Sequence, residues 1–584
     1  MTIVAADDVS DDPWDVRLAV GATGLLREAN LAGVLAAADV HVATRLGVLS
    51  GESDERVLLA LAMAVRGVRG GSVCIDLEQA RQTDPALPWP PLAEWVAAIG
   101  QSPLVGPDKP LRWDQGLLYL DRYWRQENQV HADLLAREDQ PPPVVDQVRL
   151  AAALDRLFPS DAPAQRTAAG LSANRWTTVL GGGPGTGKTT TVARVLALLL
   201  DQPGPPLRVA LAAPTGKAAA RLQEAVQQEV LGFDQADRER VGTRTASTMH
   251  RLLGTLPGAG GRFRYHRANR LPFDVIVVDE TSMVSLTMMA RLLEATRPDA
   301  RLVLVGDPDQ LASVEAGAVL ADLVGGLAGR RGRDGNRRTA VAMLDRIWRF
   351  HGGIAELAAA VRDGDADRAI GVLSGVQQDV RFGSDGVRAD VVDAAAAVRS
   401  AGLAGDAVAA LSHLQRHRVL CAHRTGPFGV QEWSRQIERW LQEVIDRRDE
   451  GEWYIGRPLL VTANDQSLGL FNGDTGVVIR QNDGTPRAVF ARGGSFVRWA
   501  PSRLSEVQTV HAMTVHRSQG SQFGRVSFVL PPEDSPLLTR ELLYTGLTRA
   551  REFVRVIGTP EQLRTAIERR AARASGLGDR LRHS

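Results

Sequence analysis

Short apolar runs alternate with helical patterns along the chain beyond about residue 150. TTVLGGG, LRVALAAP, DVIVVDE and RLVLVGD each end in glycine or in a polar or turn residue, and helical stretches lie between them. A second such pattern begins at about residue 356, with VLCAH, RVSFVL and FVRVIG as candidate strands. Near-continuous apolar strands separated by helices are typical of a parallel sheet covered on both faces, which binds ligands at the carboxyl ends of its strands. The pattern therefore predicts two α/β domains.

Residues 456–507 interrupt the second pattern. GVVIR, RAVFA and SFVRWA are short strand candidates, and Asp483-Gly484 and Gly493-Gly494 between them are strong hairpin signals. We expect a small antiparallel β-barrel inserted into the second α/β domain.

A proline triplet at residues 141–143 separates the N-terminal region from the α/β part, because a proline run cannot continue a helix and favours an extended linker. Before it, residues 115–137 place Leu117, Leu120 and Trp124 at the i, i+3, i+7 spacing of one helical face, which predicts an amphipathic helix. Residues 1–139 are therefore expected to form a separate, mostly helical domain.

Composition narrows the class of protein. The 584 residues are 44% hydrophobic and 23% charged, which excludes a largely disordered chain. Two cysteines cannot form a disulfide framework, and neither a signal-peptide core nor a membrane-length apolar run stands out, so we expect a soluble cytoplasmic protein without a membrane partner. The net charge is +1, but residues 1–110 carry 8 Lys+Arg against 15 Asp+Glu. A nucleic-acid partner is therefore expected to meet the later part of the chain.

A phosphate-binding loop is the strongest chemical signal. The segment GGPGTGKT (182–189) fits G-x-x-x-x-G-K-[ST], follows an apolar strand and precedes a helical pattern. Backbone N–H groups of such a loop and the N-terminus of its helix cradle phosphates. Lys188 is expected to reach the β- and γ-phosphates of ATP, and the Thr189 hydroxyl to bind Mg²⁺. The expected nucleotide-binding residues are Gly182, Gly183, Pro184, Gly185, Thr186, Gly187, Lys188, Thr189 and Thr190.

Two further strand ends carry candidate catalytic groups. Asp279 and Glu280 follow DVIVV, where Asp279 can bind Mg²⁺ and Glu280 can act as the base for an attacking water. An ordinary helix N-cap is the alternative explanation for this acidic pair. Gln310 follows the next strand, in GDPDQ, where its amide can orient water or sense the γ-phosphate.

These motifs and further blocks, taken in order, resemble the RecD family of superfamily 1 DNA helicases, the alpha subunits of the RecBCD helicase–nuclease (exodeoxyribonuclease V). The resemblance extends from Gln165 to about Arg551. Its blocks are AAPTGKAAARL (212–222), TASTMHRLLG (245–254), LPFDVIVVDETSMV (271–284), VGDPDQLASVEAGAVL (305–320), VLCAHRTGPFGVQEW (419–433), GRPLLVTANDQSLGLFNGDTG (456–476), HAMTVHRSQGSQF (511–523) and ELLYTGLTRAR (541–551).

The resemblance implies an α/β fold of two RecA-like P-loop motor domains with a helical N-terminal domain and a small inserted SH3-like β-barrel. The expected boundaries are 1–139 for the helical, partner-docking domain, 140–355 for motor domain 1 with a small pin insertion near 254–270, 356–455 and 508–584 for motor domain 2, and 456–507 for the barrel.

Roles at the nucleotide follow from the same resemblance. Gln165, 23 positions before Lys188, matches the glutamine that recognises adenine, and an amide can satisfy both the N6 donor and the N7 acceptor. Arg349, in IWRF, and Arg549, in LTRAR, match the two arginines that reach the γ-phosphate from motor domain 2. Arginine suits this role because its charge is not titrated away.

Candidate DNA contacts lie on both motor domains. Pro214, Thr215 and Lys217 follow a strand and offer N–H groups, a hydroxyl and one of only three lysines among 69 Lys+Arg. RFRYHRANR (262–270) combines arginines with aromatic rings suited to base stacking, and the family places its duplex-splitting pin near here. The expected DNA-binding residues are Pro214, Thr215, Lys217, Thr248, His250, Phe263, Tyr265, Thr514, His516 and Arg517.

Three features depart from a simple assignment. Gln522 stands where the family commonly has an acidic residue in K-S-Q-G-S-E-F, and Arg517 stands at the lysine of that block. Ser434 stands where an asparagine is usual. His413, His417 and His423 with Cys421 suggest a zinc site. However, the segment CAH (421–423) lies on an apolar strand and no second cysteine is near, so we favour no metal site there.

The resemblance implies an ATP-dependent 5′→3′ DNA helicase, a subunit beside RecB-like and RecC-like partners in double-strand-break repair, with nuclease activity in the RecB-like partner. The alternative is a free-standing RecD-like helicase, which is disfavoured because such relatives carry a longer N-terminal extension. A nucleotide-dependent DNA-binding assembly module is a further alternative, but it leaves the paired arginines unexplained.

Overall fold

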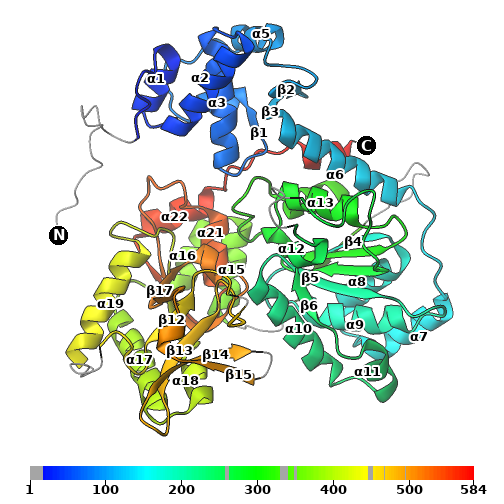
Figure 1. The fold of residues 1–584 in the computed structure, drawn as a ribbon, viewed down its shortest axis with the longest axis vertical. Helices are drawn as coiled ribbons and strands as arrows, with labels where there is room; N and C mark the ends of the chain where they lie inside the picture. The colour runs from blue at the N-terminus through cyan, green and yellow to red at the C-terminus, as the bar shows by residue number, and fades with distance from the viewer. Residues whose placement is uncertain are drawn as a thin grey trace.

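The computed structural model describes residues 17–256, 262–328, 340–346, 352–375, 377–444, 451–465, 467–492 and 495–583. These residues form four β-sheets with their helices (Figure 1). We name the sheet regions, in chain order of their first strands, the N-terminal domain, motor domain 1, motor domain 2 and the insert. Among the described residues, no helix combines the length and the apolar character needed to cross a lipid bilayer.

Motor domain 1 contains a six-stranded parallel sheet in the order β6-β5-β7-β8-β4-β9. Its strands β4, β7 and β8 are buried along their whole length, as their continuous apolar character requires. The strands are β4 (Thr177–Gly182), β5 (Val209–Ala213), β6 (Ala246–Thr248), β7 (Val275–Val278), β8 (Arg301–Gly306) and β9 (Val341–Leu344). The helices are α7 (Gln147–Leu157), α8 (Pro163–Asn174), α9 (Lys188–Leu200), α10 (Gly216–Val230), α11 (Gln235–Val241), α12 (Met249–Leu253), α13 (Leu286–Ala295) and α14 (Val319–Leu327).

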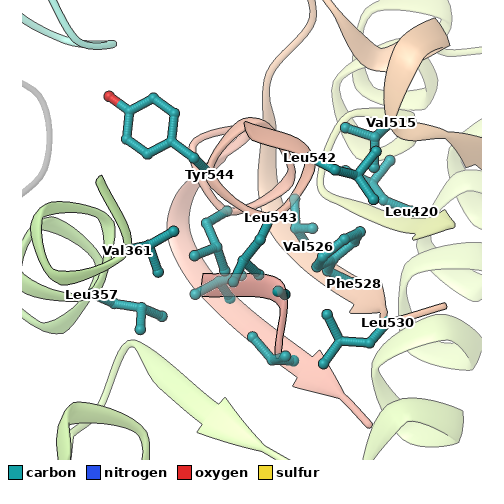
Figure 2. Packing of buried hydrophobic residues seen from close by; sticks show 14 of the residues in the cluster. Leu357, Val361, Leu420, Val515, Val526, Phe528, Leu530, Leu542, Leu543 and Tyr544 are labelled. Carbon is teal, nitrogen blue, oxygen red and sulfur yellow. The ribbon is translucent and has the colours of Figure 1, made fainter. Parts of the chain in front are cut away.

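Motor domain 2 contains a five-stranded parallel sheet in the order β10-β19-β18-β11-β17. Figure 2 shows part of its core, where Val526 and Phe528 of β18 pack beneath α21, and the ring of Tyr544 points away from this cluster. The strands are β10 (Val380–Phe382), β11 (His417–Cys421), β17 (Ala512–Thr514), β18 (Phe523–Val529) and β19 (Ala550–Ile557). The helices are α15 (Gly353–Asp363), α16 (Ala366–Ser374), α17 (Val387–Leu403), α18 (Ala407–Leu414), α19 (Val430–Val444), α20 (Val515–Ser518), α21 (Arg540–Leu547) and α22 (Pro560–Glu568).

The insert is a five-stranded antiparallel sheet in the order β15-β14-β13-β12-β16. Its strands are β12 (Pro458–Val461), β13 (Thr475–Arg480), β14 (Pro486–Arg492), β15 (Ser495–Trp499) and β16 (Val507–Thr509). In the part of the chain that the structure describes, β15 and β16 are the two edges of this sheet. A small antiparallel insert in motor domain 2 is therefore present, while a closed barrel is not among these pairings.

The N-terminal domain combines helices with a three-stranded antiparallel sheet, in the order β1-β3-β2. The strands are β1 (Cys74–Asp76), β2 (Leu111–Asp114) and β3 (Leu117–Leu120). The helices are α1 (Gly24–Leu31), α2 (Ala37–Ser50), α3 (Glu55–Arg69), α4 (Leu77–Arg81), α5 (Leu92–Gln101) and α6 (Asp121–Glu138).

The prediction of one helix over residues 115–137 is wrong in its first part. Gln115 and Gly116 both adopt positive φ angles, 51° and 79°, as the central residues of a tight hairpin between β2 and β3 do. This turn sends Leu118 and Tyr119 into the core as a strand, and the helix begins only at Asp121.

The end of the chain crosses between domains. After α22, the chain leaves motor domain 2, and α23 (Leu577–Arg582) packs against α14 of motor domain 1 and α6 (Figure 1). The buried carboxylate of Glu127 on α6 accepts hydrogen bonds from Arg580 at 3.0 Å, from the Gly576 N–H at 3.1 Å and from Tyr119 at 3.1 Å. The expectation that residues 508–584 all belong to motor domain 2 therefore does not hold for this last segment.

We predict that Leu577→Ala destabilises the protein. Leu577 is fully buried in a cluster that joins α23 to motor domain 1 and the N-terminal domain, so its truncation removes apolar contacts and leaves a cavity that costs about 2–5 kcal/mol. Thermal unfolding should show a lower midpoint. Val148→Ala, at an 82% exposed position, is the control and should change stability by less than about 0.5 kcal/mol. Equal midpoints for the two variants would contradict this account of the C-terminal helix.

Candidate nucleotide and DNA site

The strand order of motor domain 1 brings the predicted catalytic motifs together. Because β7, β8 and β4 are neighbours and parallel, the loops that follow them meet at one edge of the sheet. The phosphate loop follows β4, Asp279 follows β7 and Asp307 follows β8. This edge is therefore the candidate nucleotide site.

The phosphate loop is closed around the Lys188 ammonium. Lys188 Nζ donates hydrogen bonds to the carbonyl oxygens of Gly182 at 2.7 Å and Gly183 at 2.9 Å. Gly185 and Gly187 have φ angles of 83° and 82°, so the turn uses backbone that other residues adopt only with strain. The loop leads directly into α9, whose first N–H groups lack helical acceptors and suit a phosphate.

Asp279 and Glu280 lie at the carboxyl end of β7, opposite the phosphate loop. Burial and the neighbouring Glu280 raise the pKa of Asp279 to about 6, and Lys188 opposes this shift. Glu280 has a φ of 52°, a left-handed conformation that is strained for a residue with a side chain and is found most often at functional sites. Glu280 precedes the short helix 281–283 and makes no side-chain cap. The Asp279 carboxylate accepts, at 2.8 Å, the N–H of Glu280, which lies before that helix, so neither acid is an ordinary N-cap.

A hydrogen-bonded chain crosses from motor domain 1 to motor domain 2. Gln310 Nε2 donates to the Asp307 carboxylate at 2.8 Å, and Arg549 Nη2 donates to Gln310 Oε1 at 3.0 Å. All three side chains are buried, and burial raises the pKa of Asp307 and lowers the pKa of Arg549. The structure thus brings together two predicted catalytic residues, Gln310 and Arg549, from different domains.

A cleft opens beside this chain of hydrogen bonds, between the phosphate loop and motor domain 2. Gly183, Pro184 and Thr186 line one wall, and Arg362 and Tyr544 line the other. The Tyr544 hydroxyl lies so close to the loop that a Cβ at Gly183 would be 3.0 Å from it. Arg349, the second predicted arginine, lies outside the described residues.

Gln165 is buried on α8, directly behind the phosphate loop. Its side-chain amide donates to the Thr186 carbonyl oxygen at 3.4 Å, at the outer limit of a hydrogen bond. The glutamine therefore lies beside the phosphate loop, and its contact with adenine stays a prediction.

The three predicted DNA-binding threonines share one local geometry. Thr215, Thr248 and Thr514 each follow or end a strand and cap the next helix, with the hydroxyl oxygen accepting a backbone N–H at 3.2–3.3 Å. Each hydroxyl can still donate its own hydrogen to a phosphate. Pro214 precedes the first of these caps and lies at the carboxyl end of β5.

Lys217 lies between motor domain 1 and the insert. Its Nζ donates to the Gly473 carbonyl oxygen at 3.4 Å, and Phe471 packs where a Cβ of Gly216 would be 3.4 Å away. Burial, together with Arg418, lowers the pKa of Lys217 to about 8, and Asp474 opposes the shift. The insert therefore contacts the predicted DNA-binding loop directly.

The remaining predicted DNA contacts differ in exposure. Arg517 is exposed, and burial lowers the pKa of the partly buried His516. His250 is exposed, with its ring centroid 6.0 Å from that of Phe263. Phe263 and Tyr265 are half-buried against the core of motor domain 1, so only part of each ring is accessible to a base.

Sequence reasoning passed over three residues at this site. Asp307 lies within the GDPDQ block, where only Gln310 was given a role. Arg362 lies outside the recognised blocks and lines the cleft. Arg221 donates from α10 to the Gly520 carbonyl oxygen of motor domain 2 at 3.0 Å. The only available signal was a charged residue within or near a recognised block, which in an arginine-rich chain is weak.

The residues present fit a magnesium ion, because a carboxylate at Asp279 and a hydroxyl at Thr189 are the hard oxygen ligands that Mg²⁺ accepts beside nucleotide phosphates. Over the described ranges, no group of three or more His, Cys, Asp or Glu is arranged to hold a metal without a nucleotide.

In the candidate zinc cluster, His417 pairs with Ser527 and His423 with Ser535, and burial lowers the pKa of His417 to about 4.

Three sequence families match parts of the chain. They are the AAA domain over residues 161–384, the UvrD-like helicase C-terminal domain over 509–557, and the RecBCD enzyme subunit RecD, N-terminal domain, over 31–119.

Two curated relatives and one solved structure illustrate the similarity. The RecBCD enzyme subunit RecD of Mycolicibacterium smegmatis is 55% identical over 94% of this chain and 98% of its own length. The ATP-dependent RecD2 DNA helicase of Deinococcus radiodurans is 33% identical over 69% of this chain and 50% of its own length. Pif1 helicase from Bacteroides, in complex with ADP-AlF3 and ssDNA, shares 16% identity and a TM-score of 0.38 over 68% of this chain and 93% of its own.

We predict that neutralising Asp279, after β7, and Asp274, before it, has opposite effects on the stability of the fold at pH 7.5. Folding raises the pKa of Asp279, so its charge destabilises the folded, nucleotide-free protein as pH rises from about 4 through 6. Asp279→Asn should therefore raise the unfolding midpoint at pH 7.5, by about 1–2 kcal/mol in stability, and the gain should disappear near pH 4.

Asp274, just before β7, is the matched control. Burial alone would raise its pKa, but hydrogen bonds from Arg208 and Arg297 lower it to about 2, so its charge stabilises the fold above pH 4 and this stabilisation is lost as pH falls toward 2. Asp274→Asn should lower the midpoint at pH 7.5. A destabilising Asp279→Asn at that pH would refute the account of the nucleotide site.

Proposed function

The chain belongs to the RecD family of RecBCD enzyme subunits and is an ATP-dependent DNA helicase, and from this premise we propose that it is the 5′→3′ motor of a RecBCD-like complex. The single observation that supports the motor mechanism best is the buried contact from Arg549 to Gln310 across the two motor domains. A hydrolysis site that is completed by two domains converts ATP turnover into relative domain movement.

At the nucleotide site, each residue has a distinct task. Lys188 and the N–H groups of the phosphate loop bind the β- and γ-phosphates, and Gln165 recognises the base. Glu280 accepts a proton from the attacking water, whose oxygen forms a bond to the γ-phosphorus while the bond to the β-phosphate oxygen breaks. Arg549 stabilises the charge that develops on the transferred phosphoryl group, and Gln310 holds Arg549 in position.

Thr189 and Asp279 would hold Mg²⁺ with the nucleotide. The ion neutralises charge on the β- and γ-phosphates when bound. The raised pKa of Asp279 supports this assignment, because a carboxylate in a buried, acidic environment gains most from a cation. Arg349 remains the proposed second arginine at the γ-phosphate.

Single-stranded DNA is proposed to lie across both motor domains. The three helix caps at Thr215, Thr248 and Thr514 offer hydroxyl donors, and Lys217 and Arg517 supply positive charge for phosphates. The contact of Lys217 with Gly473 supports a role for the insert, proposed to be SH3-like, in covering this path. Closing and opening of the two motor domains would then move the strand.

Assembly with RecB-like and RecC-like subunits is favoured over a free-standing helicase. The identity to a RecD subunit extends over nearly all of that protein, whereas this chain covers half of the RecD2 relative. The N-terminal domain is proposed as the docking region. Its helix α2 exposes Val48 and Leu49, with 70% and 65% of their surface accessible, and such side chains are typical of a protein interface.

We predict ATP-dependent unwinding of duplexes with a 5′ single-stranded tail and not of duplexes with a 3′ tail. Lys188→Ala should abolish unwinding and lower ATP hydrolysis by about 100-fold or more, because it removes the ammonium charge that stabilises the transferred phosphoryl group. The measurement is strand separation by the full chain, alone and with its partners. Opening from the 3′ tail alone would refute the polarity, while an active Lys188→Ala variant would refute the nucleotide site.

We predict that the chain co-elutes with RecB-like and RecC-like proteins of its own organism after co-expression. Val48→Asp combined with Leu49→Asp should weaken this assembly at least about tenfold, because the charges would be buried at the interface. Val148→Asp, at a position that is also exposed but lies in motor domain 1, is the matched control and should leave assembly unchanged. A chain that elutes alone and unwinds DNA without partners would support the free-standing alternative.

A further inference from the structure

Leu311 belongs to motor domain 1 by sequence but to the core of motor domain 2 by packing. It follows the β8 turn directly after Gln310, yet its side chain lies in the large hydrophobic cluster of motor domain 2. Every other described residue of that cluster lies at or beyond Ile354, and Leu311 is only 6% exposed. The turn that carries Gln310 is therefore anchored in motor domain 2.

Both backbone groups of Leu311 are also bonded to motor domain 2. Its N–H donates to Thr545 Oγ1 at 2.8 Å, and Gln519 Nε2 donates to its carbonyl oxygen at 2.9 Å. Thr545 and Gln519 are themselves buried. Because a buried backbone group without a partner is costly, any movement between the domains has to carry this peptide along or break these bonds.

The two ends of this connection lead to the two functional sites. On one side, Gln310 holds Arg549 at 3.0 Å and Asp307 at 2.8 Å. On the other side, Gln519 ends the short segment that begins with the DNA-facing Thr514, and its N–H donates to the His516 carbonyl oxygen at 3.3 Å. The Gln519 side chain thus connects the proposed DNA-binding segment 514–517 to the turn that carries Gln310.

We propose that Gln519 is a positioning residue that couples DNA binding at residues 514–517 to ATP hydrolysis through its hydrogen bond to the Leu311 carbonyl oxygen. The proposal rests on the DNA contacts proposed above. DNA bound to His516 and Arg517 fixes the conformation of this loop, and Gln519 transmits that conformation to the peptide between Gln310 and Leu311. The alignment of Gln310 with Arg549 then depends on whether DNA is bound.

Linkage gives this proposal a second consequence. If DNA binding changes the affinity for ATP through this contact, then ATP must change the affinity for DNA by the same factor, because the two binding free energies are linked. Replacing a residue that carries the coupling should therefore change both the effect of DNA on the ATP site and the effect of ATP on the affinity for DNA. A residue that only stabilises the fold would not change this factor.

The test compares Gln519→Leu with Ser521→Ala in the full chain. Leucine has nearly the same volume as glutamine but cannot donate a hydrogen bond, whereas the Ser521 hydroxyl is buried in the same loop without a partner among the described residues. We measure ATP hydrolysis with and without oligo-dT, and the affinity for oligo-dT with and without Mg²⁺ and a non-hydrolysable ATP analogue. In Gln519→Leu, the stimulation of hydrolysis by oligo-dT should fall at least fivefold, and the effect of the analogue on DNA affinity should be lost. Hydrolysis without DNA and DNA affinity without nucleotide should stay within twofold of wild type, and Ser521→Ala should match wild type throughout.

The outcomes separate the inference from the function on which it rests. Full stimulation in Gln519→Leu, or an equal loss of hydrolysis with and without DNA, would overturn the coupling role. An absence of stimulation in the wild-type chain would instead count against the DNA site.

If Gln519→Leu does not fold, Thr545→Val replaces it, because it removes the acceptor of the other Leu311 bond. Thr545→Ser keeps that hydroxyl and should restore the stimulation. The inference fails if Thr545→Val and Thr545→Ser are stimulated equally.

Discussion

A positive charge buried at the contact between two domains is the constraint on which the rest of this structure depends. Arg549 is only 3% exposed, and its described hydrogen bonds go to neutral oxygens of Gln310, Thr545, Ser521 and Thr548. A guanidinium keeps its charge even where burial lowers its pKa, and a charge in a medium of low dielectric constant acts strongly over short distances. Small shifts of motor domain 2 would therefore change the electrostatic environment beside the phosphate loop. The catalytic role proposed for Arg549 requires that the residues around it be held rigidly.

The chain meets this requirement by sharing hydrophobic cores across domain boundaries. Leu577 and Leu581 of the C-terminal helix complete a cluster that also holds Tyr119 of the N-terminal domain, so these parts form one packed unit with motor domain 1. The contacts of motor domain 2 with that unit include Leu311, the Arg549–Gln310 and Arg221–Gly520 hydrogen bonds and, by way of the insert, Lys217. Movement between the motor domains would therefore have to change these contacts, which lie beside the phosphate loop or on the proposed DNA path.

The parts of the site that sequence predicts are those built from one strand and the loop that follows it. The phosphate loop and Asp279 are of this kind, because a parallel sheet fixes where the ends of its strands lie. Residues 117–120 were mispredicted because a short apolar run fits both a helical and a strand period, and the backbone of Gly116 decides between them. The role of Leu311 could not be predicted, because an apolar residue after a turn gives no sign that its core belongs to another domain.

The structure gives a reason why this lysine-poor chain has lysine at two positions of the candidate site. The Lys188 ammonium bonds to the carbonyl oxygens of Gly182 and Gly183 within one tight loop, a space that suits a compact donor and not a planar guanidinium. Lys217 lies where burial brings its pKa to about 8, so its charge responds to its surroundings, whereas an arginine there would stay charged. Arg549 has the opposite requirement, a permanent charge with several directed donors. The choice between the two basic residues thus follows the physical task of each position, which explains why an arginine-rich chain retains lysine at both motifs.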